Sequence, residues 1–233
     1  MPEKLTLEQK LDSIYKLEDK TDLSADDWNK ISELINDDSS EIRLEISEML
    51  ALFPSENSEK MLLSILNDSD YLIRASVCDS LYFSVSQETL QELMIFAKDK
   101  RYLVRGYAIL SIGDIQLNLK TDSGPIVEYL KMLEQKEKSQ WVKIAIYRSL
   151  FILGDLSYGE KLVNMINNRY YKNRIFALNL IKQLFEDNQY NNMPNIITVI
   201  NKRLETERAY SVKLELNKLL EICSNKNNAE TQG

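Results

Sequence analysis

The residue types that most often carry out catalysis are scarce in this chain. Histidine is absent, and the two cysteines are Cys78 and Cys223. The missing imidazole excludes Ser-His and Cys-His nucleophilic systems, histidine general bases and histidine-containing metal sites. Two thiols cannot form a thiolate zinc site, and they indicate a reducing cytoplasm rather than a disulfide framework. We therefore expect a protein without catalytic activity, cofactor or metal.

Adjacent carboxylates occur at Asp26-Asp27 and at Asp37-Asp38. Both pairs lie beside the boundaries of apolar helical patterns, where aspartate is typical of helix starts and turns. The sequence contains no phosphate-binding loop and no nucleophile elbow. The two pairs are therefore interpreted as structural residues rather than as metal ligands.

A basic and aromatic cluster, RYYKNR, occupies residues 169–174. Tyrosines between arginine and lysine can hold single-stranded nucleic acid through base stacking and phosphate contacts. Strong nucleic-acid binding, however, normally requires a basic footprint across the whole domain. Contact with nucleic acid near Arg169, Tyr170 and Lys172 is therefore a secondary interpretation.

A basic residue recurs along the chain at nearly constant spacing. These anchor positions are Arg43, Arg74, Arg105, Lys143, Arg174 and Lys213, separated by 31, 31, 38, 31 and 39 residues. Six positions before the anchors stand Asp37, Asp68, Asp99, Glu137, Asn168 and Glu207. The positions one before, three after and seven after each anchor are apolar, except for Asn173. These offsets place one apolar stripe on a helix in every unit.

Further helical segments with apolar faces lie between the anchored helices. They are predicted at residues 58–66, 88–97, 126–133, 160–166 and 195–204. Each unit is then a helical hairpin that cannot bury both faces alone, so neighbouring hairpins must stack. Residues 6–18 are predicted to cap the N-terminal end of the stack. The apolar residues expected on one side of this capping helix are Leu7, Leu11, Ile14 and Tyr15.

These patterns predict an all-α fold, namely a right-handed α-solenoid of about six stacked helical hairpins with an N-terminal capping helix. The solenoid is expected to form a single domain over residues 1–224, and the polar residues 225–233 are expected to be disordered. The sequence has no signal-peptide pattern and no stretch that approaches about 18 consecutive apolar residues. A cytoplasmic location without membrane contact is therefore expected.

The repeated pattern D-x(4)-[VI]-R-x(2)-[AIV]-x(3)-[LI] resembles the short form of the HEAT repeat, over Asp26 to Glu221. In HEAT proteins the aspartate and arginine form a ladder of hydrogen bonds between adjacent repeats, so the resemblance implies a structural role for the anchors. The residues that match this role are Asp37, Asp68, Asp99, Arg43, Arg74, Arg105 and Arg174. The residues that depart from it are Glu137, Asn168, Glu207, Lys143 and Lys213, which implies a less regular ladder in the C-terminal half.

HEAT proteins often bind partners on the surface formed by the second helix of each hairpin, and positions off the buried stripe of that helix define a candidate face. Its predicted partner-binding residues are Glu45, Glu48, Asp79, Tyr82, Tyr107, Tyr147, Arg148 and Phe151. Aromatic residues are preferred interface anchors, although large rings also pack between neighbouring helices. Tyrosine further recurs three residues before the anchor, at Tyr71, Tyr102, Tyr171 and Tyr210. That recurrence favours packing of these tyrosines against neighbouring helices.

Charge is distributed unevenly along the chain. Residues 1–117 contain 12 Lys and Arg against 23 Asp and Glu, whereas residues 118–233 contain 17 against 13. The acidic part would attract a basic protein partner and accelerate the encounter. We therefore expect a protein-binding scaffold or adaptor. Its most concrete version is an inhibitor or immunity-type protein that masks a basic toxin or nuclease.

The resemblance also offers enzymatic alternatives. HEAT-like DNA glycosylases excise alkylated bases in a basic groove that contains tryptophans and an aspartate. This chain has only Trp28 and Trp141, both near helix starts, and its N-terminal half is acidic. Short-repeat chromophore lyases share the hairpin pattern, but the sequence shows no tetrapyrrole-binding residue to compare. Protein binding is therefore the preferred interpretation.

Overall fold

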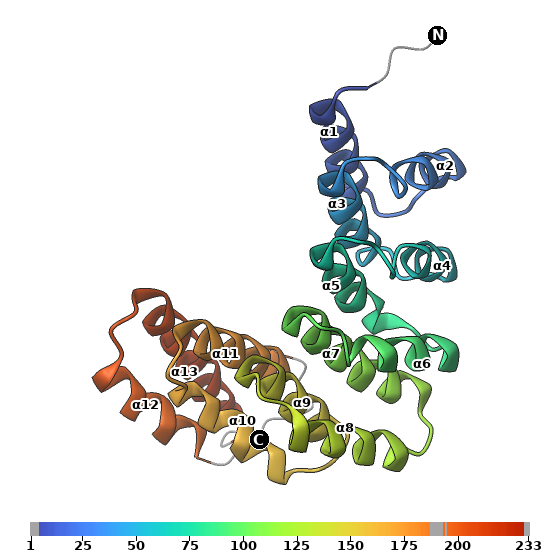
Figure 1. Cartoon of the computed structure of the whole chain (residues 1–233). Coiled ribbons are helices and arrows are strands. Elements are labelled where there is room, and N and C mark those ends of the chain that lie inside the picture. Colours follow the sequence, from blue (N-terminus) through green and yellow to red (C-terminus); the bar gives the residue numbers. More distant parts are fainter. Residues whose placement is uncertain (1–4, 187–192, 194, 231–233) are drawn as a thin grey trace. The chain divides into compact units, whose positions relative to one another are not determined.

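The computed structural model describes residues 5–186, 193 and 195–230, with side chains described as far as residue 225. Every regular element within these described residues is a helix (Figure 1). The chain divides into two compact units, unit 1 (Met1–Thr121) and unit 2 (Asp122–Gly233).

Unit 1 consists of two layers of helices (Figure 1). The first layer contains α1 (Leu7–Glu18), α3 (Ser40–Leu50), α5 (Tyr71–Ser80) and α7 (Tyr102–Leu119). The second layer contains α2 (Ala25–Leu34), α4 (Glu56–Ser64) and α6 (Gln87–Phe96), and a short 3-10 helix, η1 (Leu81–Phe83), follows α5. Helices α1, α3, α5 and α7 contact one another in that order, so each hairpin covers an apolar face of the next.

Unit 2 repeats the same arrangement. The first-layer helices are α9 (Gln140–Ile152), α11 (Tyr171–Glu186) and α13 (Tyr210–Glu230). The second-layer helices are α8 (Gly124–Lys136), α10 (Ser157–Asn164) and α12 (Ile196–Thr206), with the 3-10 helix η2 (Met165–Asn167) after α10. Helix α13 extends into the segment that the sequence predicts to be disordered, and residues 231–233 lie outside the described part of the chain. The fold is an all-α helical repeat.

The apolar stripe predicted around each anchor is buried. Ile42, Ile46 and Leu50 on α3 have no exposed surface, because α3 lies between α1 and α5. The one polar exception, Asn173, is buried on α11 and donates a hydrogen bond from Nδ2 to Asn168 Oδ1 at 3.1 Å. A buried amide is tolerated when it is hydrogen-bonded, which explains why the apolar rule fails at this position.

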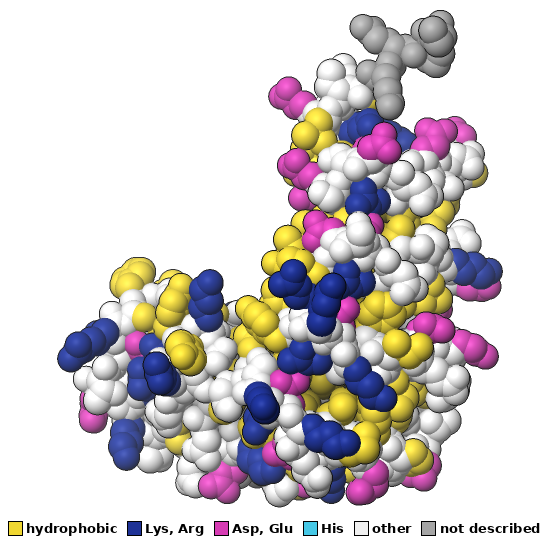
Figure 2. Space-filling view, in the orientation of Figure 1, with side chains coloured by type: hydrophobic (Ala, Val, Ile, Leu, Met, Phe, Trp, Pro, Cys, Tyr) yellow, Lys and Arg dark blue, Asp and Glu magenta, His cyan; other side chains and the backbone are white. Residues whose placement is uncertain are grey.

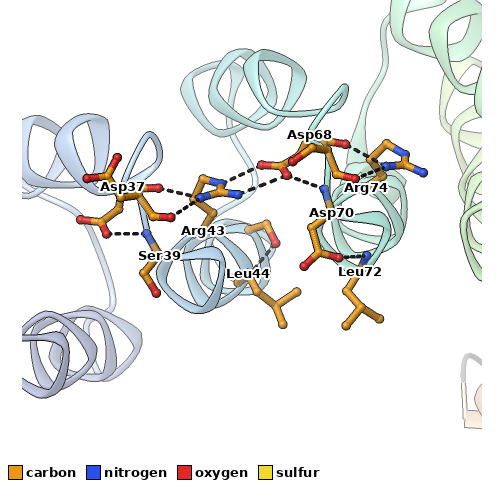
Figure 3. Close-up of polar contacts among 11 residues, drawn as sticks. Asp37, Ser39, Arg43, Leu44, Asp68, Asp70, Leu72 and Arg74 are labelled. Atoms are coloured by element: carbon orange, nitrogen blue, oxygen red, sulfur yellow. Dashed lines mark hydrogen bonds and ion pairs between the residues drawn. The ribbon is translucent and has the colours of Figure 1, made fainter.

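Arginine anchors form a ladder of ion pairs between successive repeats, and Figure 3 shows its part at Arg43 and Arg74. Arg43 donates from Nη1 to the carbonyl oxygen of Asp37 at 2.7 Å, which secures the loop before its own helix. It also donates from Nε to Asp68 Oδ2 at 2.7 Å, which connects it to the next repeat. Arg74 makes the equivalent bonds, 2.8 Å to the carbonyl of Asp68 and 3.0 Å to the carboxylate of Asp99. The structural interpretation of these arginines is confirmed.

The ladder continues in unit 2 with a different acid. Arg174 donates from Nη1 to the carbonyl of Asn168 at 2.8 Å and from Nη2 to Glu207 Oε1 at 2.9 Å. Glu207 therefore takes the place that aspartate has in unit 1, although its side-chain type departs from the repeat pattern. Asn168 keeps only the loop-capping part of the role, because its Oδ1 accepts from the N–H of Tyr170 at 3.0 Å.

Helix α1 covers the N-terminal end of the α3 layer, as predicted. Its start is a capping box, in which Thr6 and Gln9 each accept a hydrogen bond from the other's backbone N–H. Ile14 is buried, but Leu7 and Tyr15 are exposed, so the predicted apolar side of this helix is only partly correct. Lys10 on α1 forms an ion pair with Asp37 and so occupies the place of the arginine that a preceding repeat would supply.

Candidate functional site

Five of the predicted partner-binding residues belong to unit 1. Glu45 and Glu48 lie on α3, Asp79 on α5, Tyr82 in η1 and Tyr107 on α7. Serine side chains connect these helices, since Ser47 Oγ and Ser76 Oγ are 2.6 Å apart and Ser111 Oγ donates to the carbonyl of Asp79 at 3.3 Å. Small residues at the contacts bring α3, α5 and α7 close together, so their outward side chains form a continuous surface.

Like charges on this surface influence one another. Burial, followed by the nearby charges of Glu48, Glu18 and Glu41, raises the pKa of Glu45. Burial and the charges of Asp79 and Glu48 raise the pKa of Tyr107. The charge of Glu45 is the largest cause that raises the pKa of Tyr15 on α1. The residues that form this acidic face, as it is called below, are Tyr15, Glu18, Glu41, Glu45, Glu48, Asp79 and Tyr107.

The central carboxylates of the acidic face lack compensating cations. Within the described residues, Glu41, Glu45 and Glu48 form no ion pair, whereas the ladder carboxylates Asp37 and Asp68 are both paired. Glu48 and Asp79 are exposed, and Glu45 is half-buried. Figure 2 shows acidic side chains along the α1 and α3 margin of unit 1. The arrangement can therefore receive positive charge from another molecule.

Tyr15, Glu18 and Glu41 of the acidic face are not among the partner-binding residues predicted from the sequence. Glu41 could have been found, because it lies four residues before Glu45 and so on the same side of α3. Tyr15 and Glu18 could not, because they reach the face only through the packing of α1 on α3.

Three predicted site residues, Tyr147, Arg148 and Phe151, lie on α9 in unit 2 and do not belong to the acidic face. Phe151 is only 3% exposed. Its ring lies against Gly159, where an added Cβ would be 2.8 Å from Phe151 Cε2. For Phe151 the packing alternative is therefore the correct one. Tyr147 and Arg148 are half-buried.

A polar cluster that the sequence did not indicate surrounds Tyr147. Tyr158 Oη donates to Glu134 Oε2 at 2.6 Å, and Lys161 Nζ is 3.0 Å from Glu134 Oε1. Lys161 Nζ also lies 4.0 Å from the centre of the Tyr158 ring, and the Tyr147 and Tyr158 rings are 5.8 Å apart. Burial and the charge of Glu134 raise the pKa of Tyr147. Because every charge in this cluster is paired, it connects α8 to α10 rather than offering a binding site.

The basic and aromatic cluster at residues 169–174 is divided between two roles. Arg174 is buried in the ladder, whereas Arg169, Tyr170 and Lys172 are exposed. Of the tyrosines three positions before the anchors, Tyr102, Tyr171 and Tyr210 are 49%, 50% and 80% exposed. Tyr71, by contrast, is half-buried, and the guanidinium carbon of Arg101 is 4.8 Å from the centre of its ring. The packing expected from the recurrence is therefore wrong for the three exposed tyrosines. They are the first residues of their helices and lie beyond the end of the buried stripe.

The adjacent carboxylates have the structural roles predicted for them. Asp27 Oδ2 accepts from the N–H of Ser24 at 2.9 Å, at the start of α2, and from Lys20 Nζ at 2.7 Å. These bonds, first those from Lys20 and then those from Ser24, lower the pKa of Asp27 to about 2. Cys78 and Cys223 are both buried and are not joined in a disulfide. None of the helices in the described residues combines the length and apolar character that crossing a membrane requires.

Residues 29–113 match the family model for HEAT repeats. No curated protein matches the chain. Among solved structures, the complex of CpcE and CpcF of phycocyanin lyase from Nostoc sp. PCC7120 is similar, with a TM-score of 0.52 and 16% sequence identity. The similarity covers 95% of this chain and 96% of the solved chain.

This similarity corrects the expectation of a protein without catalytic activity. That expectation rested on the missing histidine and the repeat fold, and a chain with the same fold is part of a lyase. At 16% identity the likeness concerns the fold and assigns no reaction to this chain. The resemblance seen in the sequence is confirmed: residues 29–113 match HEAT repeats, and the fold is an all-α helical repeat.

Proposed function

We propose that the acidic face of unit 1 binds a basic segment of a partner protein. The observation that carries this proposal is the row of carboxylates on α3 that, within the described residues, no lysine or arginine neutralises. The proposal concerns binding and does not depend on whether the chain also catalyses a reaction. Tyr147, Arg148 and Phe151 are not part of it, because they lie in unit 2.

The acidic face lowers the stability of the free protein. Glu45 has Glu41 four residues before it and Glu48 three residues after it, on the same side of α3. Like-charge pairs at these spacings destabilise a helix by roughly 0.2–0.5 kcal/mol each. Destabilising features that persist in a folded protein are often tied to function. A cation from a partner would remove this repulsion, which supports a binding role.

Aromatic side chains accompany the carboxylates. Tyr15 is 48% exposed, and Tyr107 is half-buried on α7. Tyrosine supplies a large apolar contact with a polar tip, and aromatic anchors carry much of the binding energy in protein interfaces. The acidic face thus combines charge for steering with rings for short-range contact.

The charge of the whole unit adds a long-range component. Unit 1 contains 13 Lys and Arg against 23 Asp and Glu, a formal net charge of −10. Such a field accelerates the encounter with a basic protein and weakens as ionic strength rises. In the finer version of the proposal, the partner is a basic toxin or nuclease and the chain inhibits it by masking its basic surface.

The test compares three tagged forms of the full chain as baits in cytosol from the native cells, at low and high salt. They are the wild type, a face variant (Glu45→Gln, Glu48→Gln and Asp79→Asn) and a control variant (Asp26→Asn, Glu33→Gln and Glu92→Gln). The control removes the same charge from exposed positions on α2 and α6. Bound proteins are quantified by mass spectrometry.

We expect a basic protein that the wild type and the control capture equally, that salt releases, and that the face variant recovers roughly tenfold less. Equal capture by all three baits would contradict the proposal. Equal loss in both variants would show that net charge alone attracts the protein, and this outcome would also refute a specific acidic face. If the captured protein is a toxin or nuclease, adding the chain should reduce its activity.

A further inference from the structure

Unit 2 has a basic edge where three loops lead into its first-layer helices. The loops precede α9, α11 and α13, and these helices are neighbours in that order. The exposed cations at the end of α8, on the loops and on the first turns of the three helices are Lys136, Lys138, Arg169, Lys172, Arg208 and Lys213. Figure 2 shows lysine and arginine side chains over the α11 to α13 region. These six residues define the basic edge.

The acidic residues of the same loops accept hydrogen bonds from groups of the fold. Glu207 has a side chain only 1% exposed, and it accepts bonds from Arg174, Arg203 and the N–H of Ala209. Glu137 accepts from the N–H groups of Lys138 and Ser139 at 2.8 and 2.7 Å. The third loop carries the neutral Asn168 at the equivalent position. The outward charge of the edge is therefore positive.

The cations of the basic edge remain available to bind a ligand. In the part of unit 2 that the structure describes, none of the six forms an ion pair. By contrast, Lys131, Lys161 and Lys182 in the same unit are paired with Asp155, Glu134 and Glu215. A row of free cations at the ends of successive helices is available to a polyanion.

Exposed aromatic rings lie among these cations. Tyr170, Tyr171 and Tyr210 are 58%, 50% and 80% exposed. The guanidinium carbon of Arg169 is 5.0 Å from the centre of the Tyr170 ring. Tyr171 and Tyr210 begin neighbouring helices, so the rings are repeated at the interval between two packed helices, roughly 8–10 Å. A single-stranded nucleic acid binds by stacking its bases on exposed aromatic rings and by placing its phosphates against cations.

We infer that the basic edge binds single-stranded nucleic acid, a function separate from the acidic face and carried by different residues. Four of its six cations are lysines, which are depleted in protein interfaces but suit contact with phosphates. The negative net charge of the chain does not prevent such binding, because charges farther away than about 8 Å are largely screened at physiological ionic strength. The strand follows the loops, with its phosphates on the cations and its bases on the rings.

The experiment measures fluorescence anisotropy of a labelled twelve-nucleotide oligo(U) and oligo(dT) titrated with the full chain between 50 and 300 mM salt. A charge variant (Lys172→Gln and Lys213→Gln) is compared with a matched control (Lys202→Gln and Lys218→Gln) on exposed positions of α12 and α13. A ring variant carries Tyr171→Ala and Tyr210→Ala. All four positions of the charge and ring variants are exposed, so the fold should be retained, which circular dichroism checks.

The charge variant should reduce the slope of log K against log salt by about 1.4, because each lost phosphate contact contributes about 0.7 for a single strand. The ring variant should weaken binding roughly fivefold or more for each base that no longer stacks. The control should bind like the wild type. No binding of either oligonucleotide at 50 mM salt, or equal losses in the charge variant and the control, would overturn the inference. Equal binding of polyglutamate would overturn it as well, by assigning the edge to acidic proteins.

Discussion

Glu207 allows a quantitative test of the ion-pair ladder. Its side chain is 1% exposed and lies between Arg174 and Arg203, at 2.8 Å from a nitrogen of each. Burial alone would raise the pKa of Glu207. The N–H of Ala209 and the two guanidinium groups outweigh this effect and lower the pKa to about 2, from an ordinary value of 4.5. The ionised form is thus much more stable in the folded protein than in the unfolded chain.

The perturbation is Glu207→Gln, which keeps the size and one acceptor oxygen but removes the charge. A pKa lowered from 4.5 to about 2 corresponds to about 3 kcal/mol of folding free energy at pH 7. Because the folded pKa is the lower one, this stability is present above pH 4.5 and is lost as pH falls toward 2. The unfolding free energy of the wild type should therefore exceed that of the variant by about 3 kcal/mol at pH 7 and by only about 1 kcal/mol at pH 3.

The assay is urea denaturation followed by tryptophan fluorescence. Trp28 belongs to unit 1, and Trp141 belongs to unit 2, where its ring stacks on Phe176 at 4.1 Å. A Trp28→Phe background leaves Trp141 as the only reporter, so the transition observed is that of unit 2. Unfolding free energies are compared between wild type and variant at pH 7, 5, 4 and 3.

The matched control is Glu205→Gln, the same chemical change at an exposed position two residues away on α12. It should change the unfolding free energy by less than about 0.5 kcal/mol at every pH. If Glu207→Gln costs no more than Glu205→Gln at pH 7, the ladder contributes little in unit 2. If its cost does not decrease between pH 7 and pH 3, the ionised carboxylate is not the source of the stability.

Three further predictions concern other contacts and use the same denaturation assay, with a Trp141→Phe background for unit 1 so that Trp28 is its reporter. Arg74→Met leaves the carboxylate of Asp99, whose side chain is 12% exposed, without its guanidinium and should destabilise unit 1 by about 3 kcal/mol; a cost near zero would contradict the ladder. Gly159→Ala places a Cβ 2.8 Å from the Phe151 ring and should cost about 1–3 kcal/mol in unit 2; an unchanged transition would contradict this close contact. Glu45→Gln should stabilise unit 1 by a few tenths of a kcal/mol at pH 7 and lose this advantage below pH 4, because the raised pKa shows that ionised Glu45 is disfavoured in the fold. A destabilised Glu45→Gln would refute the account of the acidic face.

The repeat and its structural residues could be predicted because they depend on local periodicity. The offsets around each anchor place Ile42, Ile46 and Leu50 on one stripe of a helix, and a helix that repeats in register must bury that stripe against its neighbours. The same register pairs Arg43 with Asp68. The register also predicted two carboxylates of the acidic face, because it places Glu45 and Glu48 off the buried stripe.

Other parts of the site depend on contacts between residues far apart in sequence. Phe151 has the same register as Tyr82, yet it is buried because Gly159 lets α10 approach its ring. Tyr171 and Tyr210 recur like packing residues, but their places at the starts of helices leave them exposed. No spacing rule distinguishes these cases.

The sequence by itself determined the helical hairpins, the burial stripe, the anchor role of Arg43 and the surplus of acid in the first half of the chain. Each of these follows from helix geometry or from counting charges. Only the tertiary structure decided that α1 adds Tyr15 and Glu18 to the acidic face, and that Glu207 turns inward while the lysines of the basic edge stay free. The physical reason is that the burial and ion pairing of a side chain depend on its contacts with other helices. These contacts are determined by helix packing and not by the local sequence.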